Sequence, residues 1–330
     1  MAEKHLQDIL SIALEHSPDR KAVVVFDSRC ELAMTMTGAY RRCLPGAKFI
    51  DFDAVSPESI LAAFAALAPS DLAVLIQSTS FRLAAFRIRV ELFQRGIKVI
   101  EHPHLYRMGG EEAIRYVESL AYDPEYYRGV GGRLKERIDA ARSAVVDGGG
   151  EFLVFSSPFE PAKLNVGDYR GMKNVGGQFP IGEVFTEARN LEAVAGRARI
   201  FAFADTEFQV NKPGKPITLA VTKGKIAGAL DSTPEFEKVL AGIRADEGEI
   251  WIREIGFGLN RAFGPDRLVG DVGTFERACG IHLSLGAKHA VYAKPGIRRK
   301  SSKHHVDVFV AVESVRLDDA VVFRNGAWVV

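Results

Sequence analysis

Apolar runs of strand length alternate with helical patterns through the first hundred residues, and this rhythm constrains the fold more than any other feature. The apolar runs cover residues 22–26, 48–52, 72–76 and 97–100, and the helical patterns cover residues 31–42, 57–66 and 83–95. Strands and helices that alternate at this spacing predict a parallel, doubly wound sheet. Two more helical patterns, residues 112–120 and 134–144, are expected to complete this α/β domain of the Rossmann or flavodoxin-like kind.

The character of the sequence changes at a run of three glycines, Gly148 to Gly150. Beyond it, short β-rich runs are separated by turn residues, and one helix is expected at residues 233–244. The β-rich runs cover residues 152–155, 199–203, 217–221, 249–252, 306–312 and 321–323. We therefore predict two domains, an α/β domain at 1–148 and a mainly antiparallel β (α+β) domain at 149–330, with metal binding and catalysis in the second.

A nucleotide site is not expected in the first domain. The turn after its first strand, residues 27–30 (DSRC), has no glycine that would let the backbone approach a pyrophosphate. The glycine-rich stretch at residues 129–132 (GVGG) follows a helical pattern and not a strand, so we interpret it as a loop or helix cap.

Composition and charge exclude several classes of protein. The formal net charge is +1, which does not favour nucleic-acid binding. No apolar stretch approaches the roughly 20 residues of a membrane span. The three cysteines, Cys30, Cys43 and Cys279, are odd in number and have no C-x-x-C spacing, which is typical of free thiols in a reducing compartment. The sequence thus predicts a cytoplasmic globular protein without a thiolate zinc site.

Half of the eight histidines lie in one window near the end of the chain, between residues 282 and 305. Within it, His305 and Asp307 flank a valine in a segment of β-forming residues. Side chains at i and i+2 leave the same face of a strand, so this pair can reach one point. An imidazole and a carboxylate at one point suit zinc, manganese, cobalt or ferrous iron. Glu183 and Glu254 stand among apolar residues and glycines, where a carboxylate is costly unless it is paired or bound to metal.

Four segments carry a resemblance to aminopeptidase T-type metallopeptidases. Residues 182–186 (GEVFT) look like their GEVFT segment, residues 254–260 (EIGFGLN) like ELGIGTN, residues 280–286 (GIHLSLG) like CHIALG, and residues 302–307 (SKHHVD) like SLVHVDFMIG. The segments occur in the family's order and together cover most of the second domain.

The resemblance implies two divalent ions (zinc, cobalt or manganese) that activate water against an amide or peptide bond. The implied ligands are Glu183, Glu254, His282, His305 and Asp307. A shared carboxylate can bridge two cations, which together lower the pKa of a bound water; Glu254 is therefore either the bridge or the general base. The resemblance also implies a small-molecule or short-peptide substrate and a homodimer.

One position departs from the family's pattern. The family has a tyrosine seven residues after its first histidine, and this chain has His289 there. We expect His289 to act as an acid, a base or a donor to the transition state. Tyr292, three residues further on, could replace the missing tyrosine if the loop were shifted.

Two alternatives remain open. This chain also resembles the Fe(II)-dependent 2,5-dihydroxypyridine dioxygenases, which share the scaffold. They keep the pair that matches His305 and Asp307, but they have a histidine at the position of Glu254. The presence of Glu254 and His282 favours the dinuclear hydrolase. Nevertheless, His282, His305 and Asp307 would also form the two-histidine, one-carboxylate set of a single ferrous iron in a ring-cleaving dioxygenase. The second alternative is a non-catalytic metal-binding or small-molecule-binding protein.

Basic residues near the expected ligands suggest how a substrate carboxylate would be bound. Arg298 and Arg299, with Lys303, form a compact basic run before the ligand strand. Arg253 adjoins Glu254. Arginine binds carboxylates in a fixed fork, so these residues are candidate substrate-binding groups, and a solvated loop is the alternative interpretation of the run.

Overall fold

The computed structural model describes residues 1–83, 87–297 and 302–330. It divides into two compact units whose segments alternate along the chain. Unit 1 comprises Met1–Arg128 and Gly167–Ile181, and unit 2 comprises Gly129–Val166 and Gly182–Val330. The chain thus leaves unit 1, returns to it once, and leaves again.

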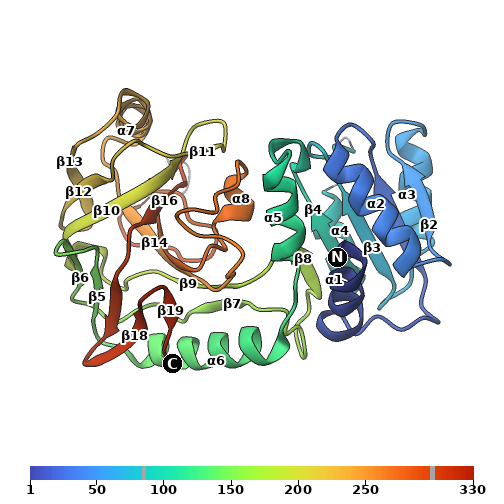
Figure 1. Ribbon diagram of the computed structural model, residues 1–330, viewed down its shortest axis with the longest axis horizontal. Helices are drawn as coiled ribbons and strands as arrows, with labels where there is room; N and C mark the ends of the chain where they lie inside the picture. The colour runs from blue at the N-terminus through green and yellow to red at the C-terminus, as the bar shows by residue number, and fades with distance from the viewer. Residues whose placement is uncertain (84–86, 298–301) are drawn as a thin grey trace. The chain divides into compact units, whose positions relative to one another are not determined.

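Unit 1 is built on a five-stranded parallel sheet, as the strand and helix rhythm predicts (Figure 1). Its strands lie in the order β2-β1-β3-β4-β8, and all neighbours are parallel. Their bounds are β1 (Ala22–Phe26), β2 (Lys48–Asp51), β3 (Leu72–Ile76), β4 (Lys98–His102) and β8 (Gly176–Gln178). The fifth strand, β8, belongs to the segment that returns from unit 2.

Helices cover both faces of this sheet. On one face, alternate strand residues such as Val23, Val25 and Leu75 share a buried cluster with residues of α3 (Pro57–Ala65) and α4 (Ile88–Gln94). Side chains of α2 (Glu31–Cys43) and α5 (Glu111–Ser119) meet His102 of β4 on the other face. The predicted doubly wound α/β arrangement is therefore confirmed. The remaining short helical elements of this unit are α1 (Ala2–Asp8), the π-helical turn η1 (Ile9–Ala13) and the 3₁₀ turn η2 (Leu105–Arg107).

The expected helix at 134–144 is wrong in its bounds. The observed helix α6 (Pro124–Ala140) begins ten residues earlier and includes the glycine-rich stretch 129–132, which is therefore neither a loop nor a cap. The reason is tertiary packing, since a Cβ on Gly131 would lie 2.7 Å from Cγ1 of Val166. Packing at this helical position requires the absence of a side chain and outweighs the low helix propensity of glycine.

Unit 2 is a curled, mainly antiparallel sheet, in agreement with the prediction for the second half of the chain (Figure 1). Its main path is β19-β18-β17-β5-β6-β10-β16-β15-β14-β9-β7, and β11, β12 and β13 extend it beside β10. The first strands are β5 (Ala144–Asp147), β6 (Phe152–Phe155), β7 (Lys163–Asn165), β9 (Glu183–Thr186), β10 (Val194–Ala204), β11 (Val210–Asn211), β12 (Ile217–Thr222) and β13 (Lys225–Leu230). The others are β14 (Ile252–Gly258), β15 (Gly280–Leu285), β16 (Val306–Val310), β17 (Ser314–Leu317), β18 (Ala320–Arg324) and β19 (Ala327–Trp328).

Three neighbouring strands, β14, β15 and β16, form the most deeply buried part of unit 2, because every one of their residues is buried. The strand expected at residues 249–252 instead starts at Ile252 and continues to Gly258, which places Glu254 within β14. Helices α7 (Pro234–Glu247) and α8 (Val272–Phe275) and the 3₁₀ turn η3 (Leu191–Ala193) complete the unit. Thr233 caps α7 by accepting a hydrogen bond from the N–H of Phe236, close to the predicted start of this helix.

The predicted boundary between residues 148 and 149 falls inside unit 2. Gly148 to Gly150 form the turn between β5 and β6, which pair with each other. The boundary between two independent domains therefore stays a prediction.

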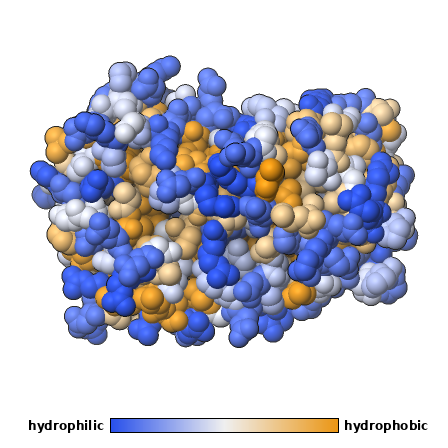
Figure 2. All heavy atoms as spheres, viewed as in Figure 1, coloured by the Kyte–Doolittle hydropathy of each residue, from blue (hydrophilic) through white to orange (hydrophobic). Residues whose placement is uncertain are grey.

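Hydrophilic and hydrophobic residues are interspersed on the visible face of the molecule (Figure 2). No helix in the described parts of the chain has the length and apolar character needed to cross a membrane.

A buried histidine links the helices of unit 1 to its sheet. The hydroxyl of Tyr40 lies 2.8 Å from Nε2 of His102, and the hydroxyl of Tyr116 lies 2.7 Å from Nδ1. Tyr116 in turn donates to the carbonyl of Phe179 at 3.3 Å. A neutral ring with its proton on Nδ1 satisfies all three hydrogen bonds, and burial lowers the pKa of His102 to about 3.

We expect this histidine to make the folded state sensitive to acid. Below pH 6.5 the unfolded chain takes up a proton at residue 102 that the folded chain does not, so stability present above that pH is lost as the pH falls towards 3. The loss is about 1.4 kcal/mol per pH unit. Imidazole NMR should show His102 in its neutral Nδ1–H form down to about pH 4, and urea unfolding should report the accompanying loss. A titration midpoint near the ordinary histidine value would contradict the assignment.

Candidate metal centre

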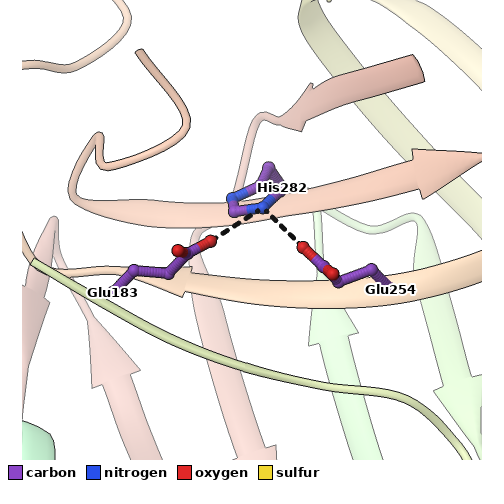
Figure 3. A group of neighbouring side chains, drawn as sticks. All are labelled: Glu183, Glu254 and His282. Atoms are coloured by element: carbon purple, nitrogen blue, oxygen red, sulfur yellow. Dashed lines mark ion pairs between the residues drawn. The ribbon is translucent and has the colours of Figure 1, made fainter. Parts of the chain in front are cut away.

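Three adjacent strands of unit 2 bring together two glutamates and a histidine. Glu183 begins β9, Glu254 lies in β14, and His282 lies in β15, with β14 paired to both neighbours. One potential ligand atom from each residue lies within 4.8 Å of the others. Figure 3 shows the imidazole facing both carboxylates. All three side chains are buried, so the group is an enclosed site and not a surface acidic cluster.

The position of the His282 ring depends on a glycine in the neighbouring strand. His282 is paired with Gly256, and a Cβ on that glycine would lie 1.9 Å from Cε1 of the imidazole. The ring therefore lies directly over the backbone of β14. This contact explains why the residue two positions after Glu254 is a glycine. The sequence shows this glycine but not the reason for it.

The contacts of His282 leave its Nε2 suited to a cation. This atom lies 3.4 Å from Oε1 of Glu183 and 3.5 Å from Oε1 of Glu254, yet it forms no hydrogen bond of good geometry with any described residue. Buried polar atoms are almost always satisfied in folded proteins. One imidazole and two carboxylates around such an atom are a donor set that divalent transition metals accept, so the residues fit a metal ion.

The predicted pair His305 and Asp307 lies beside this group. Asp307 is in β16, where it pairs with Ser284 of β15, and His305 immediately precedes that strand. Nε2 of His305 is 3.2 Å from Oδ1 of Asp307, as the i, i+2 spacing predicts. That Oδ1 is buried and has no hydrogen bond to any described residue. Oδ1 of Asp307 is thus, after Nε2 of His282, a second buried polar atom of a predicted ligand that lacks a hydrogen bond to the described residues.

The charges of the five predicted ligands act on one another. Burial alone would lower the pKa of His282, but Glu254, Glu183 and Asp307 raise it to about 9. Burial also opposes protonation of His305, whose pKa is nevertheless raised to about 10, chiefly by Asp307 and then by Glu254. Without a cation, these carboxylates therefore hold protons on both imidazoles. A metal ion would replace those protons, because only a neutral imidazole can coordinate it.

The two glutamates differ in their surroundings. Burial raises the pKa of Glu183 although Arg277 and His282 oppose this shift. Burial would raise the pKa of Glu254 as well, but the neighbouring imidazoles of His282, His289 and His305 together outweigh it and leave the pKa lowered. Glu254 is therefore the more firmly ionised carboxylate of the pair.

His289 lies at Glu254, in the loop that follows β15. Its Nε2 is 2.9 Å from Oε2 of Glu254. Its Nδ1 accepts the backbone N–H groups of Val291 at 3.1 Å and Tyr292 at 3.3 Å. A neutral ring that accepts at Nδ1 carries its proton on Nε2, so that proton is directed to the side of Glu254.

Tyr292 packs against His289, and its hydroxyl bonds to the backbone. The two ring centroids are 4.9 Å apart, and the Tyr292 hydroxyl donates to the carbonyl of Pro161 at 2.7 Å. Burial is the main cause that raises the pKa of Tyr292 to about 12. The phenol hydroxyl is thus bonded to a backbone carbonyl, while the imidazole of His289, three residues earlier, lies next to the predicted ligand Glu254.

Arg277 and Glu276 belong to the site but were missed by the sequence reasoning. Nη1 of Arg277 is 2.5 Å from Oε2 of Glu183 and 2.6 Å from Oε1 of Glu276. Arg277 is buried, and it neutralises part of the negative charge of the predicted ligands. The available signal was an adjacent acid and base just before the strand that carries His282, but such pairs are common on protein surfaces.

The predicted substrate-binding residues lie in different settings. Arg253 is buried, and its guanidinium lies 2.6 Å from Oε2 of Glu187. Lys303 is exposed, and its amine is 2.6 Å from Oδ1 of Asp246. Arg298 and Arg299 lie outside the described residues. Among the described residues, Arg253 and Lys303 are thus both paired with protein carboxylates, and their role in substrate binding stays a prediction.

Comparisons with known proteins bear on the fold. The sequence matches no protein-family model and no curated protein. The structure is similar to 2,5-dihydroxypyridine dioxygenase from Pseudomonas putida, with a TM-score of 0.66 and 16% identity over 99% of this chain and 96% of that one. It is also similar to wild-type AmpT from Thermus thermophilus, with a TM-score of 0.57 and 15% identity over 100% of this chain and 99% of that one. The resemblance inferred from the sequence is thus confirmed for the fold over the full chain.

We expect Gly256→Ala to weaken metal binding, because the new methyl group would displace the His282 ring. Changes to residues that orient a metal ligand cost about 10- to 100-fold in metal affinity. Competition titration with zinc or manganese measures the effect. Gly228→Ala in β13 is the matched control, since a Cβ there meets nothing within 4 Å. Equal affinity in the two variants would show that the ring position does not matter for metal binding.

Proposed function

We propose that this protein is a metal-dependent hydrolase that uses two divalent cations to cleave an amide or peptide bond of a small substrate. The buried group of Glu183, Glu254 and His282 carries the proposal, since one potential ligand atom of each lies within 4.8 Å of the others. A carboxylate such as that of Glu254 can bridge two cations. His305 and Asp307, at the start of the strand next to that of His282, would supply the further ligands.

The charges of the site support divalent cations. Three carboxylates, those of Glu183, Glu254 and Asp307, are buried in one region, where Arg277 and the protons on two imidazoles balance their charge unless cations take the place of those protons. Burying carboxylates without a counter-charge is expensive. When bound, two divalent ions polarise the substrate carbonyl and lower the pKa of water.

His289 would supply a proton donor next to this centre. Its Nε2–H is kept in place by two backbone N–H groups that occupy Nδ1. A neutral imidazole in this position can hydrogen-bond to an oxygen that gains charge during the reaction, or give a proton to a departing amine. The family's tyrosine would offer one hydroxyl at this place, and here the imidazole takes that role.

A cavity beside His289 favours a small substrate. It has a volume of about 270 Å³, and its lining includes His289, Tyr292, Arg253, Lys288 and Lys294. Cavities that enclose drug-sized ligands usually have volumes of about 300–1,000 Å³. The size therefore suits a single amino-acid residue or a compact amide.

One observation favours a second candidate. His282, His305 and Asp307 supply two imidazoles and a carboxylate, which is the usual ligand set of a single ferrous iron in an oxygenase. The similar Pseudomonas protein is named a dioxygenase, and the same activity here would open a hydroxylated pyridine or aromatic ring. Glu254 and Glu183 would then have no direct role as ligands.

Metal content separates these functions. The protein, purified under anaerobic conditions, is expected to hold about two zinc, cobalt or manganese ions per chain and to release amine from aminoacyl-anilides. About one iron per chain, with oxygen uptake on a dihydroxylated pyridine, would replace the hydrolase by the dioxygenase. Bound metal with neither activity would indicate a binding protein.

We expect Asp307→Ala to lose most of the bound metal, and turnover with it, while the fold is kept. The reason is that the carboxylate is a ligand on the side of the centre that His305 shares. Elemental analysis and circular dichroism measure the two effects, and Asp319→Ala, at an exposed aspartate in the turn between β17 and β18, is the control. Full metal content and turnover in Asp307→Ala would remove β16 from the site.

His289→Phe is expected to keep the metal but lower kcat by about 100-fold or more, since general acid–base or donor groups contribute at least that much. The aromatic ring keeps the packing against Tyr292. Metal analysis and steady-state kinetics of the same preparation distinguish loss of chemistry from loss of metal. Unchanged turnover would exclude His289 from the mechanism.

A further inference from the structure

The segment between β15 and β16 that carries His289 is bonded to the end of the same segment just before that residue. The N–H of Lys288 donates to the carbonyl of His304 at 3.0 Å, and the carbonyl of Lys288 lies 3.2 Å from Nδ1 of His305. These bonds hold the start of the segment against the strand that bears a predicted ligand. They do not fix the turn that follows, where His289 and Tyr292 lie.

The guanidinium of Arg253 forms hydrogen bonds with the backbone of that turn. Its Nη1 donates to the carbonyl of Ala287, and its Nη2 donates to the carbonyl of Tyr292 at 2.9 Å. One rigid guanidinium thus contacts the backbone on both sides of His289. The Arg253 side chain is only 2% exposed, so water does not compete for these carbonyls.

Glu187 fixes the guanidinium itself. Its Oε2 accepts from Nε of Arg253 at 2.6 Å, and its side chain is fully buried just after β9. Its Oε1 lies 3.2 Å from the amine of Lys294, which also lies 2.6 Å from Oε1 of Glu160. Because Lys294 is in the same segment as His289, the network joins this segment to both strands that carry the glutamate ligands.

The fully buried pairing has a physical consequence. A buried charge that loses its partner is strongly destabilised, and buried carbonyls without donors cost free energy as well. The network therefore favours one arrangement of the segment over others. In that arrangement Nε2 of His289 lies 2.9 Å from Oε2 of Glu254.

We propose that Arg253 is a positioning residue for His289, and that with Glu187 it holds residues 287–292 in the arrangement that places the imidazole at Glu254. Arg253 does not touch the substrate carboxylate in this role, which revises the role expected from the sequence. The effect on turnover rests on the proposed hydrolase function, whereas the effect on the segment does not.

Hydrogen exchange tests the positioning role directly. In Arg253→Met, peptides that cover residues 287–292 are expected to exchange about tenfold faster or more, while β14 and β15 keep their protection. Metal content should stay close to that of the unsubstituted protein. Turnover on an aminoacyl-anilide should fall by about 10- to 100-fold, mainly in kcat and much less in KM. Arg197→Met, which removes an arginine paired with Glu151 elsewhere in the sheet, is the control and should change none of these.

Two conservative variants keep the test decisive if Arg253→Met does not fold. Arg253→Lys keeps the charge but cannot bond to both carbonyls and Glu187 together, so it should give an intermediate exchange rate. Glu187→Gln should loosen the same peptides. Unchanged exchange at residues 287–292 in both would overturn the proposal. If the unsubstituted protein shows no hydrolysis, the proposed function fails, and the exchange rates still decide the role of Arg253.

Discussion

The register between β14 and β15 is the constraint on which the candidate centre depends. It places His282 opposite Gly256, and only a residue without a side chain leaves room for the imidazole above the strand. Glu254 lies two residues before Gly256, at an irregularity in the pairing, and its N–H donates to the hydroxyl of Ser284 in β15. The pairing of β14 with β9 adds Glu183. A shift of one residue would turn these side chains to the opposite face of the sheet. The centre is therefore a property of the strand pairing and not of flexible loops.

The surrounding structure compensates for the charge that this register brings together. Arg277 offsets Glu183 from one side, and the imidazoles of His282 and His289 stabilise the ionised form of Glu254. A second group of paired charges, with Arg253 at its centre, contacts the segment of residues 287–292. Two buried polar networks thus share β14, one with unsatisfied atoms that suit a cation and one with its charges paired.

The parts of this arrangement differ in how far the sequence predicts them. The parallel sheet of unit 1 follows from apolar runs such as residues 72–76, because a strand buried on both faces is apolar throughout. The pairing of His305 with Asp307 follows from the two-residue period of a strand. The role of Arg277 does not follow, since nothing local shows that the chain brings it to Glu183. Helix α6 was misjudged for the same reason, because the neighbour of Gly131 is set by tertiary packing.

The return of the chain to unit 1 bears on how the protein is made. Strand β8 is synthesised only after the first part of unit 2, yet it pairs with β4. Until it arrives, β4 is an open edge whose backbone groups can pair with another chain. Gly176 lets the late strand approach closely, since a Cβ there would lie 2.0 Å from the carbonyl oxygen of Val99. Ribosome-bound chains that end before residue 176 should therefore be the aggregation-prone stage of biosynthesis, and no single cut can separate the two units.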